Sequence, residues 1–334
     1  MNRSRVFRMV TVILLSFFFG VANLDAETLK VPYVSLSATR APLWIAEAAG
    51  LFKKQHLDVQ LLYIPGGSVL MQTMLSGDAG ISNMAPPAAI TAWAKGADLA
   101  VVAVCINRLL HVVMASPEIK RPEDLRGKKI GISRYGSLTD LSLREALRYY
   151  KLRPDKDVAI IQSGGQSERV SAMKAGALDG ALLLADSMFQ AEKLGFHPVI
   201  ELSKLPIEYP ADGIVVRKQL LRTNRDAVKR FLKAWVEGIK ILKTDRDFSI
   251  KVLGKYLRTE DQEILAKSYE IYRTGIEKVP YSSRKGFVFA LERMAETSPE
   301  VAKLNVDDLI DNRIMSELEN EGFIKEIYSE KPTR

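Results

Sequence analysis

The chain has 334 residues, of which 47% are hydrophobic and 26% charged, and its formal net charge is +8. This composition is typical of a soluble globular protein and excludes bulk disorder, a collagen and a coiled coil, while the length predicts two lobes at about 150 residues per domain. The single cysteine, Cys105, cannot form an internal disulfide, and three dispersed histidines do not complete a zinc site. The basic residues are spread along the chain, so we expect no cofactor, no metal and no nucleic-acid partner.

The first 26 residues have the layout of a secretory signal peptide. Arginines within the first eight residues precede an uncharged apolar stretch at 9–22. Such a stretch rises about 21 Å as a helix, less than the roughly 30 Å of a bilayer core, so a membrane span is the weaker interpretation. Cleavage is possible after Ala22 or after Ala26. The sequence therefore predicts export to the periplasm.

From Leu29 the chain alternates short β-rich runs with longer helical ones, which is typical of an α/β fold with mostly parallel sheets. The first series of predicted strands covers 29–35, 59–64, 80–82 and 100–105. Predicted helices begin at Pro42, which suits a first helical turn, at Ser68 as the N-cap, and near Ala85.

A second series follows, and the rest of the chain is helical. Its predicted strands cover 129–133, 158–162 and 179–184, and its predicted helices cover 138–150 and 167–175. After a strand at 214–217, apolar residues recur at helical spacing in 225–243, which places Trp235 in the core.

The two series repeat one supersecondary unit. A strand ending at Ile64 runs into Gly66-Gly67, and a strand ending at Gln162 runs into Gly164-Gly165, each followed by a helix. Parallel sheets bind ligands beyond the carboxyl ends of their strands. The repeat therefore predicts two lobes that face each other across a ligand cleft.

Five strand-to-helix junctions would face that cleft. Helix N-termini there present unpaired amides and the positive end of the macrodipole, which suit a small polar or anionic group. The predicted ligand-binding residues at the junctions are Ser37, Thr39, Gly67, Ser68, Asn83, Ser133, Arg134, Tyr135, Gly136, Ser137, Gly165 and Gln166.

Three further residues complete the predicted site, each with an alternative role. Trp44 is either a cleft wall or a core residue. Asp186 is either a ligand contact or the N-cap of the helix it begins, and Asp212 is a hinge, a cap or a ligand contact. We predict no catalytic residue, because the sequence lacks a Gly-x-Ser-x-Gly elbow, a His-Glu-x-x-His motif and a P-loop. The chain is therefore not expected to be an enzyme.

Several segments resemble the substrate-binding proteins of nitrate, sulfonate and taurine type ABC importers. That family also includes binding proteins similar to the thiamine-pyrimidine synthesis enzymes. The segments are Ala41-Pro42-Leu43-Trp44-Ile45-Ala46, Gly66-Gly67-Ser68, Gly77-Asp78 and 122–132. The resemblance covers nearly the whole mature chain. It implies a two-lobed periplasmic-binding-protein fold of type II, with crossovers near 113–116 and 209–213 and closure of the lobes around a ligand.

The expected organisation is a signal peptide at 1–26, a first lobe at 27–115 plus 212–334 with a helical C-terminal region, and a second lobe at 116–211. The expected function is capture of a small organic anion and delivery to a membrane permease, by a monomer. One alternative is a receptor for a pyrimidine or another neutral heterocycle stacked on Trp44 or Tyr135. Another is a cofactor-biosynthesis enzyme on the same fold.

Overall fold

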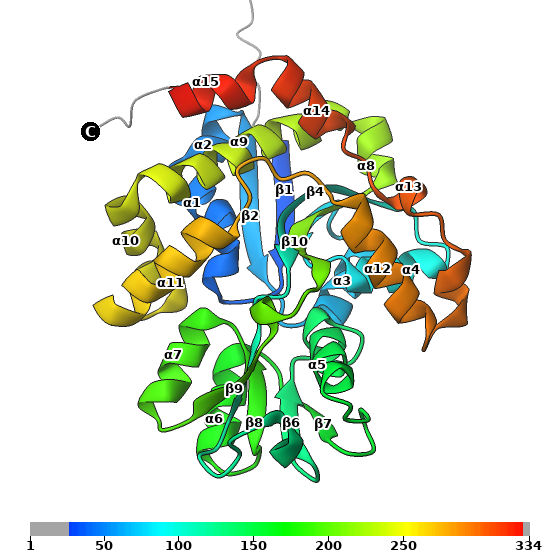
Figure 1. Cartoon of the computed structure of the whole chain (residues 1–334). Coiled ribbons are helices and arrows are strands. Elements are labelled where there is room, and N and C mark those ends of the chain that lie inside the picture. Colours follow the sequence, from blue (N-terminus) through cyan, green and yellow to red (C-terminus); the bar gives the residue numbers. More distant parts are fainter. Residues whose placement is uncertain (1–26, 330–334) are drawn as a thin grey trace, which may run out of the picture.

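The computed structural model describes residues 27–329, so the predicted signal peptide lies outside the described residues. Two lobes, one above the other in Figure 1, are each built on a five-stranded sheet. The first sheet has the order β2-β1-β3-β10-β4. Its strands are β1 (Glu27–Tyr33), β2 (Leu57–Tyr63), β3 (Ile81–Met84), β4 (Leu99–Arg108) and β10 (Glu208–Arg217).

The second sheet has the order β7-β6-β8-β5-β9. Its strands are β5 (Val112–Ala115), β6 (Lys129–Ile132), β7 (Ala159–Gln162), β8 (Gly180–Leu183) and β9 (His197–Glu201). In each sheet three neighbouring strands run parallel, namely β2, β1 and β3 in the first sheet and β7, β6 and β8 in the second. The other two strands of each sheet pair antiparallel with each other, β10 with β4 and β5 with β9, and β10 and β5 are also antiparallel to β3 and β8. The predicted two-lobed α/β fold is confirmed.

Helices cover both sheets (Figure 1). Those that follow the strands of the first lobe are η1 (Ala38–Arg40), α1 (Ala41–Ala48), α2 (Leu51–Lys54), α3 (Gly67–Ser76) and α4 (Pro87–Ala94). The second lobe holds η2 (Pro122–Leu125), α5 (Leu138–Tyr149), α6 (Gln166–Lys174) and α7 (Ala185–Lys193), and η3 (Leu202–Lys204) lies in the segment that returns to the first lobe. The C-terminal region consists of α8 (Lys218–Thr223), α9 (Arg225–Thr244), α10 (Arg246–Leu257), α11 (Gln262–Gly275), α12 (Arg284–Ala295), η4 (Pro299–Lys303), α13 (Val306–Leu309), α14 (Arg313–Asn320) and α15 (Phe323–Ser329).

The chain changes sheets a few residues from the predicted crossovers. Residues 112–115 form β5 of the second sheet, so the first crossover is 109–111. The second is 202–207, because β10 already pairs with β4 at Glu208. The Leu202 amide donates to the His111 carbonyl at 3.0 Å, which ties the two crossover segments together. Both segments continue apolar strands, so hydrophobic patterning did not mark where one sheet ends and the other begins.

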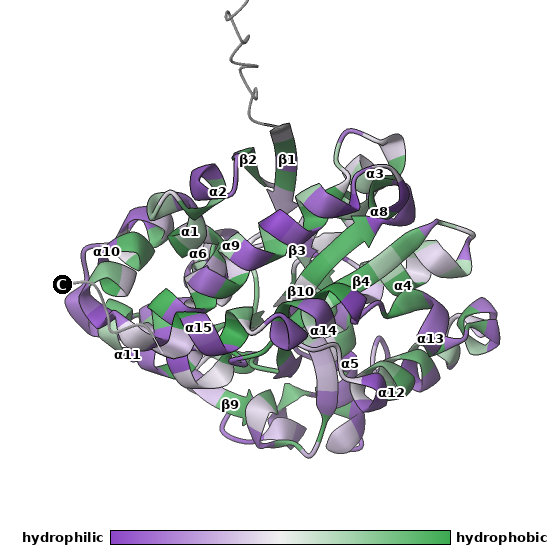
Figure 2. Ribbon diagram, turned by 90° about the horizontal axis from the view of Figure 1, so that it is seen from above, coloured by the Kyte–Doolittle hydropathy of each residue, from purple (hydrophilic) through white to green (hydrophobic). Residues whose placement is uncertain are grey.

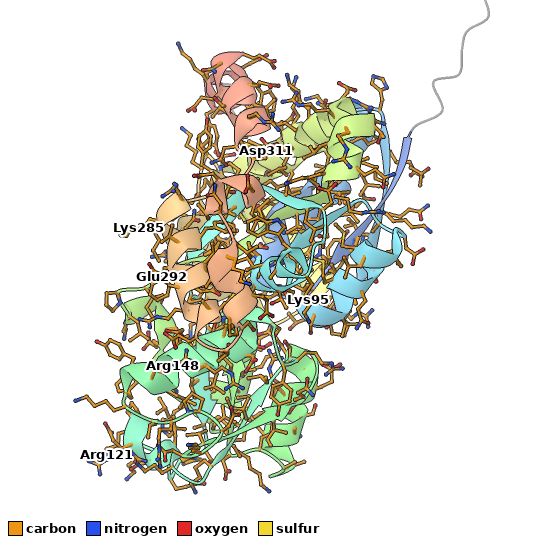
Figure 3. The ribbon with its side chains drawn as sticks, turned by 90° about the vertical axis from the view of Figure 1, so that its right-hand side faces the viewer. Lys95, Arg121, Arg148, Lys285, Glu292 and Asp311 are labelled. Atoms are coloured by element: carbon orange, nitrogen blue, oxygen red, sulfur yellow. The ribbon has the colours of Figure 1, made fainter. Side chains whose placement is uncertain are left out.

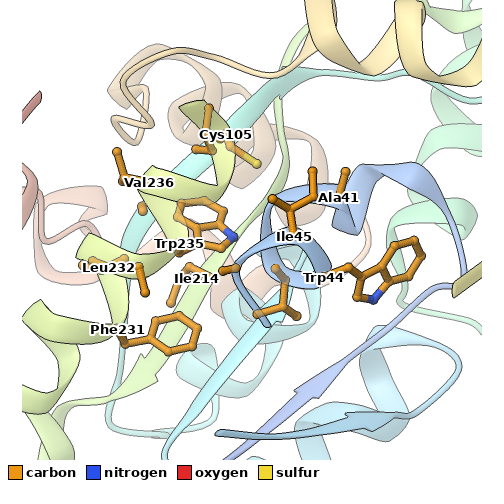
Figure 4. Packing of buried hydrophobic residues seen from close by; sticks show 14 of the residues in the cluster. Ala41, Trp44, Ile45, Cys105, Ile214, Phe231, Leu232, Trp235 and Val236 are labelled. Atoms are coloured by element: carbon orange, nitrogen blue, oxygen red, sulfur yellow. The ribbon is translucent and has the colours of Figure 1, made fainter. Parts of the chain in front are cut away.

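The first lobe has its core between the sheet and the helices α1 and α9. Figure 2 shows β10 and β4 as hydrophobic strands at the centre of the molecule. Trp235 of α9 is fully buried, which confirms its predicted core position (Figure 4). Trp44 of α1 is also fully buried, and its ring stacks on Tyr256 of α10 at a centroid distance of 4.8 Å. Within residues 27–329, none of the helices has the length and apolar character needed to cross a membrane.

Candidate functional site

A cavity of about 70 Å³ lies between the two lobes. Its first-lobe lining comprises Val34, Ser35, Thr39, Arg40, Tyr63, Gly66, Gly67, Ala85, Ala88, Ile106 and Ala211. Its second-lobe lining comprises Ser133, Ser137, Leu138, Thr139, Gly165, Gln166, Arg169 and Leu184, and the first crossover contributes Leu110 and His111. The cavity therefore lies where the strand-to-helix junctions of the two lobes meet.

Direct contacts between the lobes flank this cavity on two sides. On one side, Lys193 of α7 forms an ion pair with Asp261 beside α11, at 2.5 Å. On the other side, Arg148 of α5 lies 3.5 Å from Glu296, the residue after α12. Figure 3 shows Arg148 at the edge of the second lobe, below the helix that carries Glu292. The structure thus holds the lobes together around the cavity.

Three helices that begin at the cavity lack side-chain caps. The N-cap residues of α3, α5 and α6 are Gly66, Ser137 and Gly165, and none makes a side-chain cap hydrogen bond. Side-chain caps are also absent from α1, α4, α7 and α8, whereas α9 to α12 are capped by Asn, Asp or Ser side chains. Uncapped amides at a helix N-terminus are donors for an anion. The cavity is therefore a place where such donors converge.

The start of α3 differs from the sequence-based prediction. Gly66, not Ser68, is the N-cap, and its φ of +88° favours glycine. A Cβ at this position would lie 2.8 Å from Cγ of Arg134 in the second lobe. The prediction of Ser68 as the cap was wrong, because the helix begins one residue earlier, at Gly67.

Three hydroxyl groups form a cluster at the start of α5. The side-chain oxygens of Ser133, Ser137 and Thr139 lie 2.8 to 2.9 Å from one another. Ser137 donates its hydrogen to the carbonyl of Arg134 at 2.7 Å. The hydroxyls of Ser133 and Thr139 donate only to other hydroxyls of the cluster and not to a carbonyl. One of them can therefore turn its hydrogen toward a ligand without breaking a hydrogen bond to the backbone.

Arg169 of α6 is a buried cation at the cavity. Its Nε donates to the carbonyl of Leu182 at 3.0 Å and its Nη1 to the carbonyl of Gly164 at 2.6 Å. It forms no ion pair with any residue of 27–329, and its side chain is 2% exposed. Burial lowers the pKa of Arg169 to about 10, so the guanidinium keeps its charge at neutral pH. Arg169 therefore carries a positive charge without an ion-pair partner within 27–329, although the charge of Glu168 opposes the lowering of its pKa.

Arg40, the other arginine of the lining, is neutralised. Its Nη1 lies 2.5 Å from Oδ1 of Asp212, and the Asn83 amide donates to the same carboxylate at 2.9 Å. Burial raises the pKa of Asp212 to about 6, although the charge of Arg40 opposes that rise. Asn83 and Asp212 do not line the cavity but hold Arg40 in place.

Asp186 connects the lobes and does not line the cavity. It is the second residue of α7 and accepts a hydrogen bond from Ser37 of the first lobe at 2.7 Å. Its other oxygen accepts from Gln166 at 3.3 Å, and Tyr272 of α11 lies 3.4 Å from Oδ1. Burial raises the pKa of the Asp186 carboxyl, while these hydrogen bonds oppose the rise. The predicted N-cap role is not observed, because Leu184 is the N-cap.

The structure brings together only part of the predicted set. Thr39, Gly67, Ser133, Ser137, Gly165 and Gln166 line the cavity, whereas Ser37, Trp44, Ser68, Asn83, Arg134, Tyr135, Gly136, Asp186 and Asp212 do not. The cavity is also lined by Arg169, His111, Tyr63 and apolar side chains, which are not among the residues predicted from the sequence. Arg169 had a usable signal, because it lies three residues after Gln166 and therefore on the same face of the helix.

Comparisons with known proteins agree with this fold. A relative in Bacillus subtilis (strain 168), YtlA, is 26% identical over 256 residues, which cover 73% of this chain and 75% of the relative. The taurine-binding periplasmic protein of Escherichia coli (strain K12) is 26% identical over 211 residues, 61% of this chain and 64% of that protein. Among solved structures, the nitrate-binding protein NrtA of Synechocystis PCC 6803 superposes with a TM-score of 0.77 at 15% identity, covering 93% of each chain.

The family assignment comes from a sequence model. The model described as "NMT1/THI5 like" matches residues 37–247. This range covers more than half of the chain and includes most of the residues that line the cavity. The chain therefore belongs to the NMT1/THI5-like family.

Proposed function

We propose that this chain is the extracytoplasmic solute-binding protein of an ABC importer and that it captures a small organic anion, such as a sulfonate or a carboxylate. The observation that carries the proposal is the cavity between the lobes, lined by Arg169 and by three uncapped helix N-termini. These groups attract and orient an anion. A ligand that contacts both lobes favours their closed arrangement, which is the state a permease would receive.

The names of relatives support this ligand class and location. The E. coli relative is named for taurine and for the periplasm, and two structural relatives are named for sulphonate and nitrate binding. The signal peptide predicted at 1–26 fits the same location. We infer a monomer with two partners, the ligand and the membrane permease.

The two alternatives receive less support from the site. A heterocycle stacked on Trp44 or Tyr135 would need those rings in the cavity, but Trp44 is buried in the core and Tyr135 is 48% exposed outside the lining. An enzyme that used Cys105 as its nucleophile would need a reactive thiol. Cys105 is fully buried, and burial together with Asp212 raises the pKa of its thiol well above the ordinary value. We therefore infer that the chain binds its ligand without converting it.

The test is identification of the bound molecule. The full chain is expressed in a bacterial host with a periplasm and purified from that compartment under native conditions. Denaturation should release one small anion per chain, identified by mass spectrometry. A neutral heterocycle, or a released molecule that the native protein converts to a product, would contradict the proposal.

A further inference from the structure

Most of the apolar lining of the cavity comes from the first lobe and the first crossover. It consists of Val34, Ala85, Ala88, Ile106, Leu110 and Ala211, next to the polar side chains of Ser35, Thr39, Arg40 and Tyr63. The second lobe contributes the hydroxyl cluster, Gln166 and Arg169, together with the apolar side chains of Leu138 and Leu184. A ligand that fills the cavity therefore meets both apolar side chains and hydrogen-bond donors, and Arg169 supplies a positive charge from the second lobe.

His111 supplies an unsatisfied polar group at this cavity. Its side chain is 4% exposed, its Nδ1 is buried without a partner, and the ring forms no hydrogen bond within residues 27–329. Burial and the nearby charge of Arg169 lower the pKa of His111 to about 3, so the imidazole is neutral and carries one N–H donor. A buried imidazole without a partner is unfavourable unless a ligand supplies the missing hydrogen bond.

The charge of the lining limits the charge of the ligand. Asp212 neutralises Arg40 at 2.5 Å, whereas Arg169 has no carboxylate partner among the described residues. The carboxylate next in sequence, Glu168, acts on Arg169 through its charge, but it is exposed to solvent, which screens this interaction. One buried positive charge can compensate one negative charge, and a second negative charge would be desolvated without a partner.

We propose that Arg169 and His111 together bind the anionic end of a compact amphiphilic monoanion, whose apolar body lies against Ala85, Ala88 and Ile106 of the first lobe. This inference rests on the proposed function and adds the charge, polarity and orientation of the ligand. Arg169 donates from its free Nη2 and His111 from its ring N–H, so the anionic group needs at least two oxygen acceptors.

The first experiment compares ligands of matched size by calorimetry, after the copurified molecule has been removed by unfolding and refolding. The probes are butane-1-sulfonate and butyrate as monoanions, succinate and ethane-1,2-disulfonate as dianions, and butyramide as the neutral analogue. We expect a monoanion to bind at least about 10-fold more tightly than either dianion, and butyramide not to bind. Equal or tighter binding of a dianion or of butyramide, or no binding by either monoanion, overturns the inference.

The second experiment removes the charge. Arg169→Gln should weaken monoanion binding by about 30-fold or more, and Arg169→Lys should weaken it less, because Lys keeps the charge but loses the planar geometry. Lys174→Gln, which removes an exposed charge from the same helix, is the matched control and should leave affinity unchanged. Loss of binding in Lys174→Gln equal to that in Arg169→Gln would assign the effect to net charge and overturn the inference.

A measurement on the unchanged protein covers the case in which Arg169→Gln does not fold. The chain has three histidines, so the ¹⁵N signals of the imidazoles can be assigned by single substitutions. Saturation with the monoanion should shift the His111 ring signals and leave those of His56 and His197 in place. Unchanged His111 signals at saturation would overturn the inference. That result would not decide the proposed function, which is tested separately by mass spectrometry of the copurified molecule.

Discussion

The Ser37 hydroxyl donates a hydrogen bond of 2.7 Å to Oδ1 of Asp186, and this bond joins the first lobe to the second. Tyr272 strengthens the same connection, because its hydroxyl lies 3.3 Å from Ser37 Oγ and accepts from the amide of Ala185 at 3.2 Å. All of these side chains are buried when the lobes are together. The connection therefore favours the closed arrangement specifically.

Replacing Tyr272 by Phe should destabilise the closed arrangement without changing the packing of α11. A hydrogen bond to a charged group is worth about 1.5–3 kcal/mol, so the Kd of a bound monoanion should rise about 10-fold or more. Calorimetry gives the Kd, and small-angle scattering gives the fraction of closed molecules at saturation. Tyr269→Phe on the same helix is the matched control, since Tyr269 makes no hydrogen bond to the second lobe within 27–329. An equal effect of both substitutions would contradict the role of Tyr272.

The exposed interlobe ion pair should contribute much less. Lys193 is 46% exposed and contacts Asp261 at 2.5 Å and Glu263 at 3.4 Å. Exposed pairs are weakened by solvent and salt. We expect Lys193→Gln to raise the Kd by less than about 3-fold at 0.15 M salt, with no difference from the unchanged protein at 1 M salt. A larger effect that persists at 1 M salt would show that this contact, like the Tyr272 contact, is decisive for closure.

The sequence predicted the fold well because hydrophobic periodicity and glycine turns mark strands and helices locally. It predicted the site only where a ligand-facing residue lies at a junction, as Ser137 and Gln166 do. Trp44 and Asp186 also lie at junctions, but their side chains turn toward α10 and toward the other lobe. Which way a side chain turns depends on tertiary packing. His111 was missed because a single histidine carries no local signal of burial. Arg169 shares a helix face with Gln166, but this spacing does not show that the arginine is buried at the cavity.

The buried pair of Arg40 and Asp212 gives a prediction about stability and pH. Arg40 is 3% exposed and Asp212 is 1% exposed. Arg40→Met leaves the carboxylate buried without its counter-ion, which should lower the free energy of unfolding by about 3–5 kcal/mol at pH 8. The double variant Arg40→Met with Asp212→Asn should recover most of that loss, because no charge is then left unpaired. Denaturant unfolding at constant ionic strength measures each value.

The pH dependence follows from the pKa of Asp212, which burial raises to about 6. A carboxyl group whose folded pKa is raised contributes stability at low pH, and this stability is lost as the pH rises through the folded pKa. Removing Arg40 raises that pKa further, because the arginine favours the carboxylate. The loss caused by Arg40→Met should therefore be smaller at pH 5 than at pH 8. If Arg40→Met lowers the free energy of unfolding equally at pH 5 and at pH 8, Asp212 does not take up a proton in the variant.

A substitution at Gly238 tests the contact between α9 and α1. The position of the strand-to-helix junction at Thr39 depends on this contact. A Cβ at Gly238 would lie 2.2 Å from the carbonyl oxygen of Pro42 and 3.3 Å from Cβ of Ala46. Alanine favours a helix interior over glycine by about 1 kcal/mol, but a clash with backbone forces the two helices apart at a cost of about 1–3 kcal/mol or more. We expect Gly238→Ala to lower the free energy of unfolding and the melting temperature.

Gly286→Ala in α12 is the control for that prediction, since it makes the same substitution in a helix where space is available. The nearest atom to its added Cβ is Cδ of Pro210, at an ordinary contact distance of 3.5 Å. Helix propensity then acts without a clash, and the substitution should be neutral or stabilise by up to about 1 kcal/mol. The change in the free energy of unfolding should therefore have opposite signs for the two substitutions, because the added Cβ meets the backbone of α1 at Gly238 but only ordinary contacts at Gly286. A stabilising Gly238→Ala would show that α1 moves aside freely, and the junction at Thr39 would not be held by this packing.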